Sequence, residues 1–87
     1  MSFGSGMESA AQTSDLAMRA AGVLAARQRG DVEGARTLMA SFEDDGARAY
    51  AFFLVADLCS GLLAAATGRP AGDVLQDVTL SLAARRG

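Results

Sequence analysis

The chain has 87 residues, which suits one small domain with a limited core. Apolar residues make up 51% of it, but 19 of them are alanines, which favour helix and contribute little burial energy. Eight arginines, no lysine and ten acidic residues give a net charge of −2, which disfavours a cationic nucleic-acid-binding stripe. Isoleucine is absent and other β-branched residues are few, so the predicted fold class is all-α.

The first expected helix runs from Glu8 or Ser14 to Arg29. Residues 1–12 are therefore interpreted as a flexible leader or as the start of this helix, and residues 13–87 as a single helical domain. Gly30 is expected to end the helix, and Asp31 to cap a second one that extends to about Phe42.

The segment "EDDG" at 43–46 predicts a break and a new start, with Asp44 or Asp45 as the N-cap. The third helix is expected to reach Thr67, followed by a left-handed stop at Gly68. A fourth helix is expected to begin with Pro70 as its first residue or with Asp73 as its cap. These elements predict a small four-helix bundle of two αα-hairpins, each long then short, which dimerisation would complete.

Residues 49–66 form an 18-residue apolar stretch, near the lower limit for crossing a bilayer. Seven Phe, Leu or Val residues contribute about −2 to −4 kcal/mol on an insertion scale, and a central aspartate costs about +2.5 to +3.5. The sum lies near zero, so the favoured interpretation is a helix surrounded by other helices. Any uncovered strip of it would be an interface.

Asp57 lies in the middle of this stretch. It is expected either to pair with Arg19, Arg27 or Arg36, or to reach water at the edge of the apolar surface. An alternative role is a polar group that sets the register of an interface. The candidate core or contact residues are Phe52, Phe53, Leu54, Asp57, Leu58 and Leu62.

Residues for catalysis are scarce. The chain has no histidine, which is the usual general base and metal ligand, and its single cysteine, Cys59, is expected to be an inert core thiol. The acids at 43–45 lack the alternation of a calcium loop. No enzyme activity, catalytic residue, cofactor or metal site is therefore predicted.

The segment "LAARQRGDVEGARTLMASF" resembles a tetratricopeptide helix-turn-helix in its Gly-Asp turn and in Ala35, five residues after Gly30. It covers under a third of the chain. No second unit follows at the 34-residue period, so the sequence does not support assignment to that family.

The predicted function is that of a cytoplasmic protein-interaction or oligomerisation module, with a second copy or another protein as its partner. The residue usage is typical of GC-rich bacterial genomes. One alternative is a helix-turn-helix regulator that contacts nucleic acid through Arg27, Arg29 and Arg36, although the charge balance disfavours it. Others are a membrane-associated protein anchored by residues 49–66, also disfavoured, and a binder of a small molecule between helices.

Overall fold

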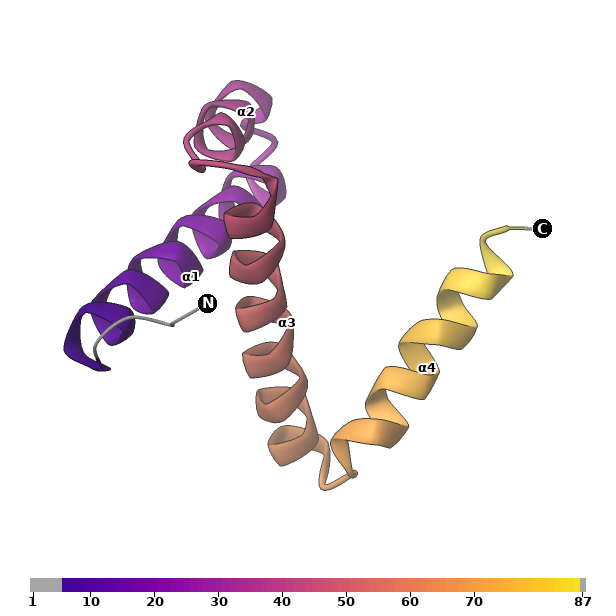
Figure 1. Cartoon of the computed structure of the whole chain (residues 1–87). Coiled ribbons are helices and arrows are strands. Elements are labelled where there is room, and N and C mark those ends of the chain that lie inside the picture. Colours follow the sequence, from indigo (N-terminus) through magenta and orange to yellow (C-terminus); the bar gives the residue numbers. More distant parts are fainter. Residues whose placement is uncertain (1–5, 87) are drawn as a thin grey trace. The chain divides into compact units, whose positions relative to one another are not determined.

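The computed structural model describes residues 6–86, which contain four α-helices and, within that range, no strand (Figure 1). The all-α prediction is therefore confirmed. The helices are α1 (Gly6–Gln28), α2 (Val32–Ala40), α3 (Asp45–Thr67) and α4 (Ala71–Ala84). The chain forms two compact units, the first ending at Val55 and the second beginning at Ala56, so the boundary falls inside α3.

In the first unit, α1 packs against α2 and against the first half of α3. The buried cluster consists of Ala20, Val23, Phe42 and Ala51. Half-buried apolar residues surround it: Leu16, Ala35, Leu38, Phe52 and Val55. Because two of the four central residues are alanines with no exposed surface, the helices approach each other closely and the core has little volume.

The turn between α1 and α2 has the predicted chemistry. Gly30 adopts a left-handed conformation with φ of 76°, and the amide of Asp31 donates a 2.9 Å hydrogen bond to the carbonyl oxygen of Ala26. This is the geometry of a Schellman stop, which glycine adopts without a Cβ penalty. The Asp31 carboxylate then accepts a 2.8 Å bond from the amide of Gly34 and caps α2, as predicted.

The boundaries of α1 and α2 differ from the expected ones. The first helix begins at Gly6, before either expected start, so residues 6–12 are its first turns and only residues 1–5 of the predicted leader lie outside the described range. The second helix ends at Ala40 rather than Phe42. The Ser41 hydroxyl donates a 2.6 Å bond to the carbonyl oxygen of Leu38, and Phe42, which is 5% exposed, leaves the helix to enter the core.

Asp44 is the N-cap of α3, because its carboxylate accepts a 2.7 Å bond from the amide of Ala47. The helix ends at Thr67 as predicted, and Gly68 follows with φ of 71°. Pro70 is the N-cap of α4 rather than its first helical residue, and Asp73 is not a cap. The amide of Asp73 instead donates a 3.0 Å bond to the carbonyl oxygen of Pro70.

The second unit is a hairpin of the second half of α3 and α4, joined by a turn of three residues, 68–70. The two helices diverge from this turn (Figure 1). Val74 in the first turn of α4 is 5% exposed and is the one buried residue among those described in this unit. This hairpin therefore contains almost no core of its own.

Candidate interaction surface

The two halves of α3 differ in how far their apolar side chains are covered. In the first half, Ala51 is buried, and Phe52 and Val55 pack against the first unit's core. The rings of Phe42 and Phe52 lie 6.1 Å apart between centroids, in a tilted arrangement that favours aromatic contact. Of the candidate core or contact residues, Phe52 thus packs against the first unit's core.

Phe53 and Leu54 follow Phe52 on the same helix. Phe53 is 60% exposed, and its ring stacks on Tyr50 at 6.3 Å between centroids. Leu54 is half-buried. Phe53 therefore lies outside the first unit's core, and its expected role as a contact residue stays a prediction.

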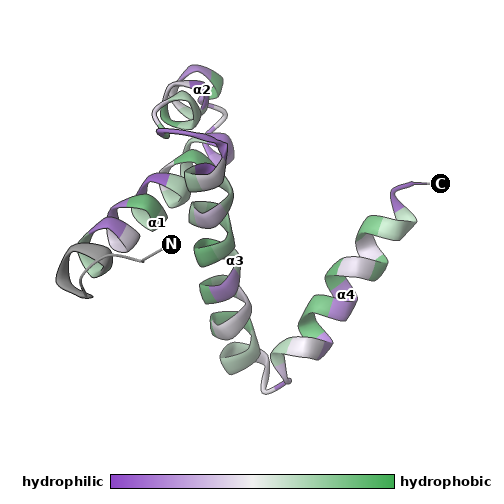
Figure 2. Cartoon of the chain, viewed as in Figure 1, coloured by the Kyte–Doolittle hydropathy of each residue, from purple (hydrophilic) through white to green (hydrophobic). Residues whose placement is uncertain are grey.

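In the second half of α3, Leu58 and Leu62 are 63% and 62% exposed. They lie one helical turn apart and continue the register of Leu54, so a single stripe runs along this side of the helix. These two leucines do not belong to a core within the described residues, because the second unit has no third helix there, and their role as contact residues stays a prediction. Most of the α3 ribbon is apolar, whereas α1 and α4 alternate apolar with polar positions (Figure 2).

On α4, Leu75, Val78, Leu80 and Leu82 are also exposed. Val78 and Leu82 share a shallow hollow of about 370 Å³ with Leu63 and Val74, bounded by Arg69, Asp77 and Arg85. Six of the seven exposed large apolar residues of this unit, all except Leu80, make up what we call the hairpin surface: Leu58, Leu62, Leu63, Leu75, Val78 and Leu82. Such a concentration of exposed leucines on a monomer is typical of an interface.

An ion pair braces the turn of this hairpin. The Arg69 guanidinium donates a 2.6 Å hydrogen bond to the Asp77 carboxylate. The bond and the charge of Arg69 lower the pKa of Asp77, and the same interactions raise the pKa of Arg69. The pair connects the 68–70 turn to the second turn of α4.

The structure distinguishes the two environments expected for Asp57. Its side chain is exposed, as expected for a carboxylate that reaches water, and it forms no ion pair with the described residues. Two of the arginines expected as its partners are otherwise engaged, since Arg19 pairs with Asp15 at 2.6 Å and Arg36 faces Glu33 at 3.5 Å. Cys59 is exposed, so the prediction of a core thiol is wrong, because no described helix of the second unit covers this side of α3.

One hollow was not foreseen from the sequence. It lies in the first unit, between α1, α2 and the start of α3, and arginines from all three helices line it: Arg27, Arg36 and Arg48. Arg27 and Arg36 were considered only as partners of Asp57 or contacts to nucleic acid. No local sequence signal indicated the hollow, because its lining residues come from three different helices.

Length and composition also make α3 a candidate membrane span. Its mean hydropathy reaches 1.8 over 18 residues, and only 6% of that window is buried. A core helix of a soluble protein passes the same test of length and composition, but it is normally mostly buried. The described residues of the chain therefore leave most of the apolar surface of α3 uncovered.

The titratable residues of the described range give no sign of a metal centre, since no three Cys, Asp or Glu side chains there are grouped to hold an ion. No family model matches the chain, and no curated protein or solved structure matches it significantly. Proposals about its function therefore rest on the residues and their geometry.

Proposed function

We propose that the chain is a non-enzymatic helical module that forms a homodimer through its hairpin surface. In this dimer two α3–α4 hairpins, one from each copy, pack across a two-fold axis as a four-helix bundle. The observation that carries the proposal is the imbalance within the second unit, which buries Val74 alone among its described residues while seven large apolar side chains stay exposed, six of them on the hairpin surface. A hairpin of about 30 residues cannot stabilise itself with one buried valine.

Covering the hairpin surface gives a favourable free energy of the same order as the cost of association. Full burial of a leucine or valine side chain is worth about 1.5–3 kcal/mol, so covering one that is half to two-thirds exposed contributes about 1 kcal/mol. Association itself costs about 4–15 kcal/mol in lost translational and rotational freedom. In a two-fold dimer each of the six residues is counted twice against a single such cost, so the gain reaches about 12 kcal/mol.

The same doubling favours a second copy over a different protein, because a heterologous partner must supply its own matching apolar surface. Asp57 and Cys59 flank this side of α3 and are exposed, so both would lie at or near the rim of the dimer. The proposed compartment is the cytoplasm, where a single accessible thiol stays reduced.

A second candidate is association with a membrane through α3. The low burial of its apolar window favours it, and the 23-residue length is sufficient to span a bilayer. Two features oppose it. Asp57 would lie within the hydrocarbon, and insertion of the whole helix would withdraw Ala51 and Phe52 from the first unit's core.

The deciding experiment is the absolute mass of the detergent-free chain by light scattering after gel filtration. We expect a dimer, and we expect the double variant Leu58→Asp/Leu62→Asp to run as a monomer that keeps the helices of the first unit and loses part of the helix content of the uncovered hairpin. Met18→Asp is the matched control, because Met18 is 72% exposed on α1 and lies outside the hairpin surface. It should leave the dimer intact.

A wild-type monomer at all concentrations would overturn the dimer proposal. Vesicle flotation tests the alternative in parallel. Co-flotation of the wild-type chain with anionic or neutral vesicles, abolished by the same double variant, would establish the membrane candidate instead.

A further inference from the structure

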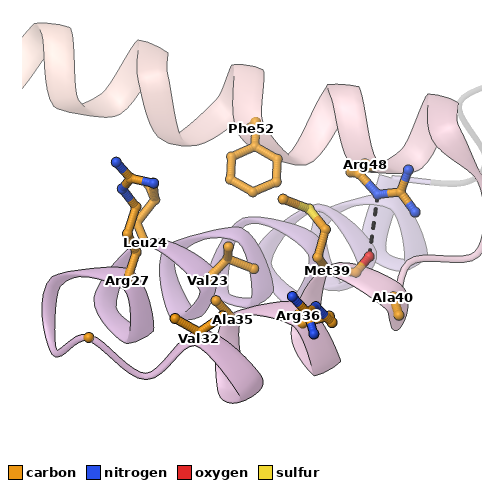
Figure 3. A pocket seen from close by; sticks show the side chains of 11 residues that line it. Val23, Leu24, Arg27, Val32, Ala35, Arg36, Met39, Ala40, Arg48 and Phe52 are labelled. Atoms are coloured by element: carbon orange, nitrogen blue, oxygen red, sulfur yellow. Dashed lines mark hydrogen bonds between the residues drawn. The ribbon is translucent and has the colours of Figure 1, made fainter.

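The hollow in the first unit is a groove of about 660 Å³ formed by α1, α2 and the first two turns of α3 (Figure 3). Its volume falls within the range of small-molecule sites, about 300–1,000 Å³. It lies wholly among residues of the first unit and includes neither Leu58 nor Leu62. Its chemistry is therefore separate from that of the hairpin surface.

Apolar side chains from three helices line the groove. They are Val23, Leu24, Val32, Met39 and Phe52. Leu24, Val32 and Met39 are exposed, so the first unit's core does not use their apolar surface. Met39 points across the groove toward Phe52 (Figure 3). A flexible thioether opposite an aromatic ring suits an apolar guest of adjustable shape.

Three arginines accompany this apolar lining, and they differ in how they are already engaged. Arg48 is held in place, because it pairs with Asp45 at 2.6 Å and donates a 3.3 Å hydrogen bond to the carbonyl oxygen of Met39. Arg36 faces Glu33 at 3.5 Å, with both side chains largely exposed. Arg27 has no ion pair with any residue in the described range.

The arrangement of these charges is directional. Arg27 projects toward α3 at the end of the groove next to Leu24, while Arg48 lies at the opposite end, with Phe52 and Met39 between them (Figure 3). The groove thus combines an available guanidinium at one end with an apolar middle. A planar guanidinium pairs with a carboxylate through two parallel hydrogen bonds, which fixes the orientation of the anion.

We infer that this groove binds an amphipathic carboxylate of the fatty-acid type. The carboxylate pairs with Arg27, the positive charge of Arg36 adds attraction, and the alkyl chain lies along Val23, Met39 and Phe52. Because the groove is open on one side, each methylene is only partly removed from water. A fully buried methylene strengthens binding about fourfold, so we expect about twofold for each one here.

The test is a titration of the full chain with dodecanoate below its micelle-forming concentration. Binding is measured by changes in the NMR chemical shifts of the backbone amides. We expect saturable shifts clustered at Val23, Val32 and Met39. Octanoate, which is four methylenes shorter, should bind on the order of tenfold more weakly. Dodecyltrimethylammonium, which has the same chain and a positive head group, should give no saturable shifts there.

Two variants distinguish specific binding in the groove from nonspecific adsorption of the amphiphile. Arg27→Gln should weaken dodecanoate binding on the order of tenfold, since a charge-assisted bidentate pair is lost. Arg29→Gln is the matched control. Arg29 lies two residues further on, does not line the groove and sits 3.7 Å from Asp31, so its loss should leave the affinity unchanged. Both residues are exposed, and circular dichroism should show unchanged helix content for both variants.

The inference is overturned if no saturable shifts occur at the groove, if the cationic analogue binds as tightly, or if the two arginine variants weaken binding equally. Shifts confined to Leu58, Leu62 and Leu75 would also overturn it, because the amphiphile would then cover the hairpin surface. None of these outcomes depends on whether the chain is a dimer, so failure here leaves the proposed function standing.

Discussion

The two halves of α3 are comparable in apolar content, yet their side chains have different surroundings. In the first unit, α1 and α2 lie against the helix, so Ala51 is buried and Phe52 packs on the core. In the second unit α4 is the only other helix, and it diverges from α3 after the turn, so Leu58 and Leu62 stay exposed. The burial of an apolar helix is thus decided by how many neighbours surround it rather than by its own composition.

This contrast has a consequence for stability. The first unit has a small core that three helices enclose, and it can hold its structure within one copy of the chain. The second unit has one buried valine and depends on what covers its leucines. Changes in the first unit should therefore affect the unfolding of each chain, whereas changes in the second should mainly affect association.

The largest expected effect is the difference in the free energy of unfolding between alanine variants of two phenylalanines. Phe42→Ala removes the largest side chain of the buried cluster and should lower the free energy of unfolding by about 3–5 kcal/mol, enough to unfold the first unit. Phe53→Ala removes the same atoms from a side chain that is mostly exposed and should cost below about 1 kcal/mol in the monomer.

Urea unfolding of both variants, followed by circular dichroism in the Leu58→Asp/Leu62→Asp background, measures this difference without the contribution of dimerisation. Equal losses would show that Phe53 is as well covered as Phe42 within one chain. The distinction between the two sides of α3 would then be wrong.

A smaller effect should come from replacing one glycine of each unit by alanine, at positions where the backbone has positive φ. Gly30 and Gly68 both have positive φ, and a Cβ at either position would meet no atom within 4 Å. Alanine at either site therefore introduces backbone strain of about 1–2 kcal/mol and no clash. Gly30→Ala should lower the stability of the monomer. Gly68→Ala should mainly weaken the dimer, by about 30- to 1,000-fold in Kd, because both copies carry the strain.

Gly72→Ala is the control for the added methyl group, because Gly72 lies within α4 at negative φ and also has open space around it. It should stabilise α4 slightly, since alanine favours helix over glycine. Analytical ultracentrifugation gives the Kd values. If Gly68→Ala destabilises the monomer as much as Gly30→Ala does, the second unit is stable without a second copy of the chain.

The contrast also shows what the sequence could predict. The left-handed stops at Gly30 and Gly68 and the caps at Asp31 and Asp44 were predictable, because each depends on a few adjacent residues. The end of α2 was misplaced, since Phe42 leaves the helix to fill space between α1 and α3. The free energy that Phe42 gains by burial comes from contacts with residues distant in the sequence, and helical periodicity carries no information about such contacts.

The candidate sites were harder to predict for the same reason. Cys59 was expected in a core because the residues around it are apolar, and its exposure follows from the lack of a third helix over this side of α3 in the described chain. For Asp57 the sequence left pairing with an arginine and contact with water open, and the structure shows an exposed side chain. The groove joins Arg27, Val32 and Phe52, which are spread over three helices, so no local motif marks it. Helix caps and stops could be predicted from the sequence, whereas the neighbours of each helix could not.

The smallest expected effect concerns the ion pair that braces the hairpin. In the first unit the three ion pairs at i,i+3 or i,i+4 spacing each lie within one helix, whereas Arg69 and Asp77 join the 68–70 turn to α4. The pKa of Asp77 is lowered in the folded hairpin from an ordinary value of 3.8. Its stabilising contribution is therefore complete above about pH 4 and is lost as the pH falls through the lower folded value.

Asp77→Asn should accordingly be less stable than the wild-type chain at neutral pH, and the two should converge in acid. The difference should shrink in high salt, because both side chains are exposed. Asp57→Asn is the control, since Asp57 is exposed and forms no ion pair with the described residues. Carbon-13 NMR of the carboxyl groups measures the pKa directly. An unshifted Asp77 would mean that Arg69 does not hold α4, and that the angle between α3 and α4 is set by the second copy alone.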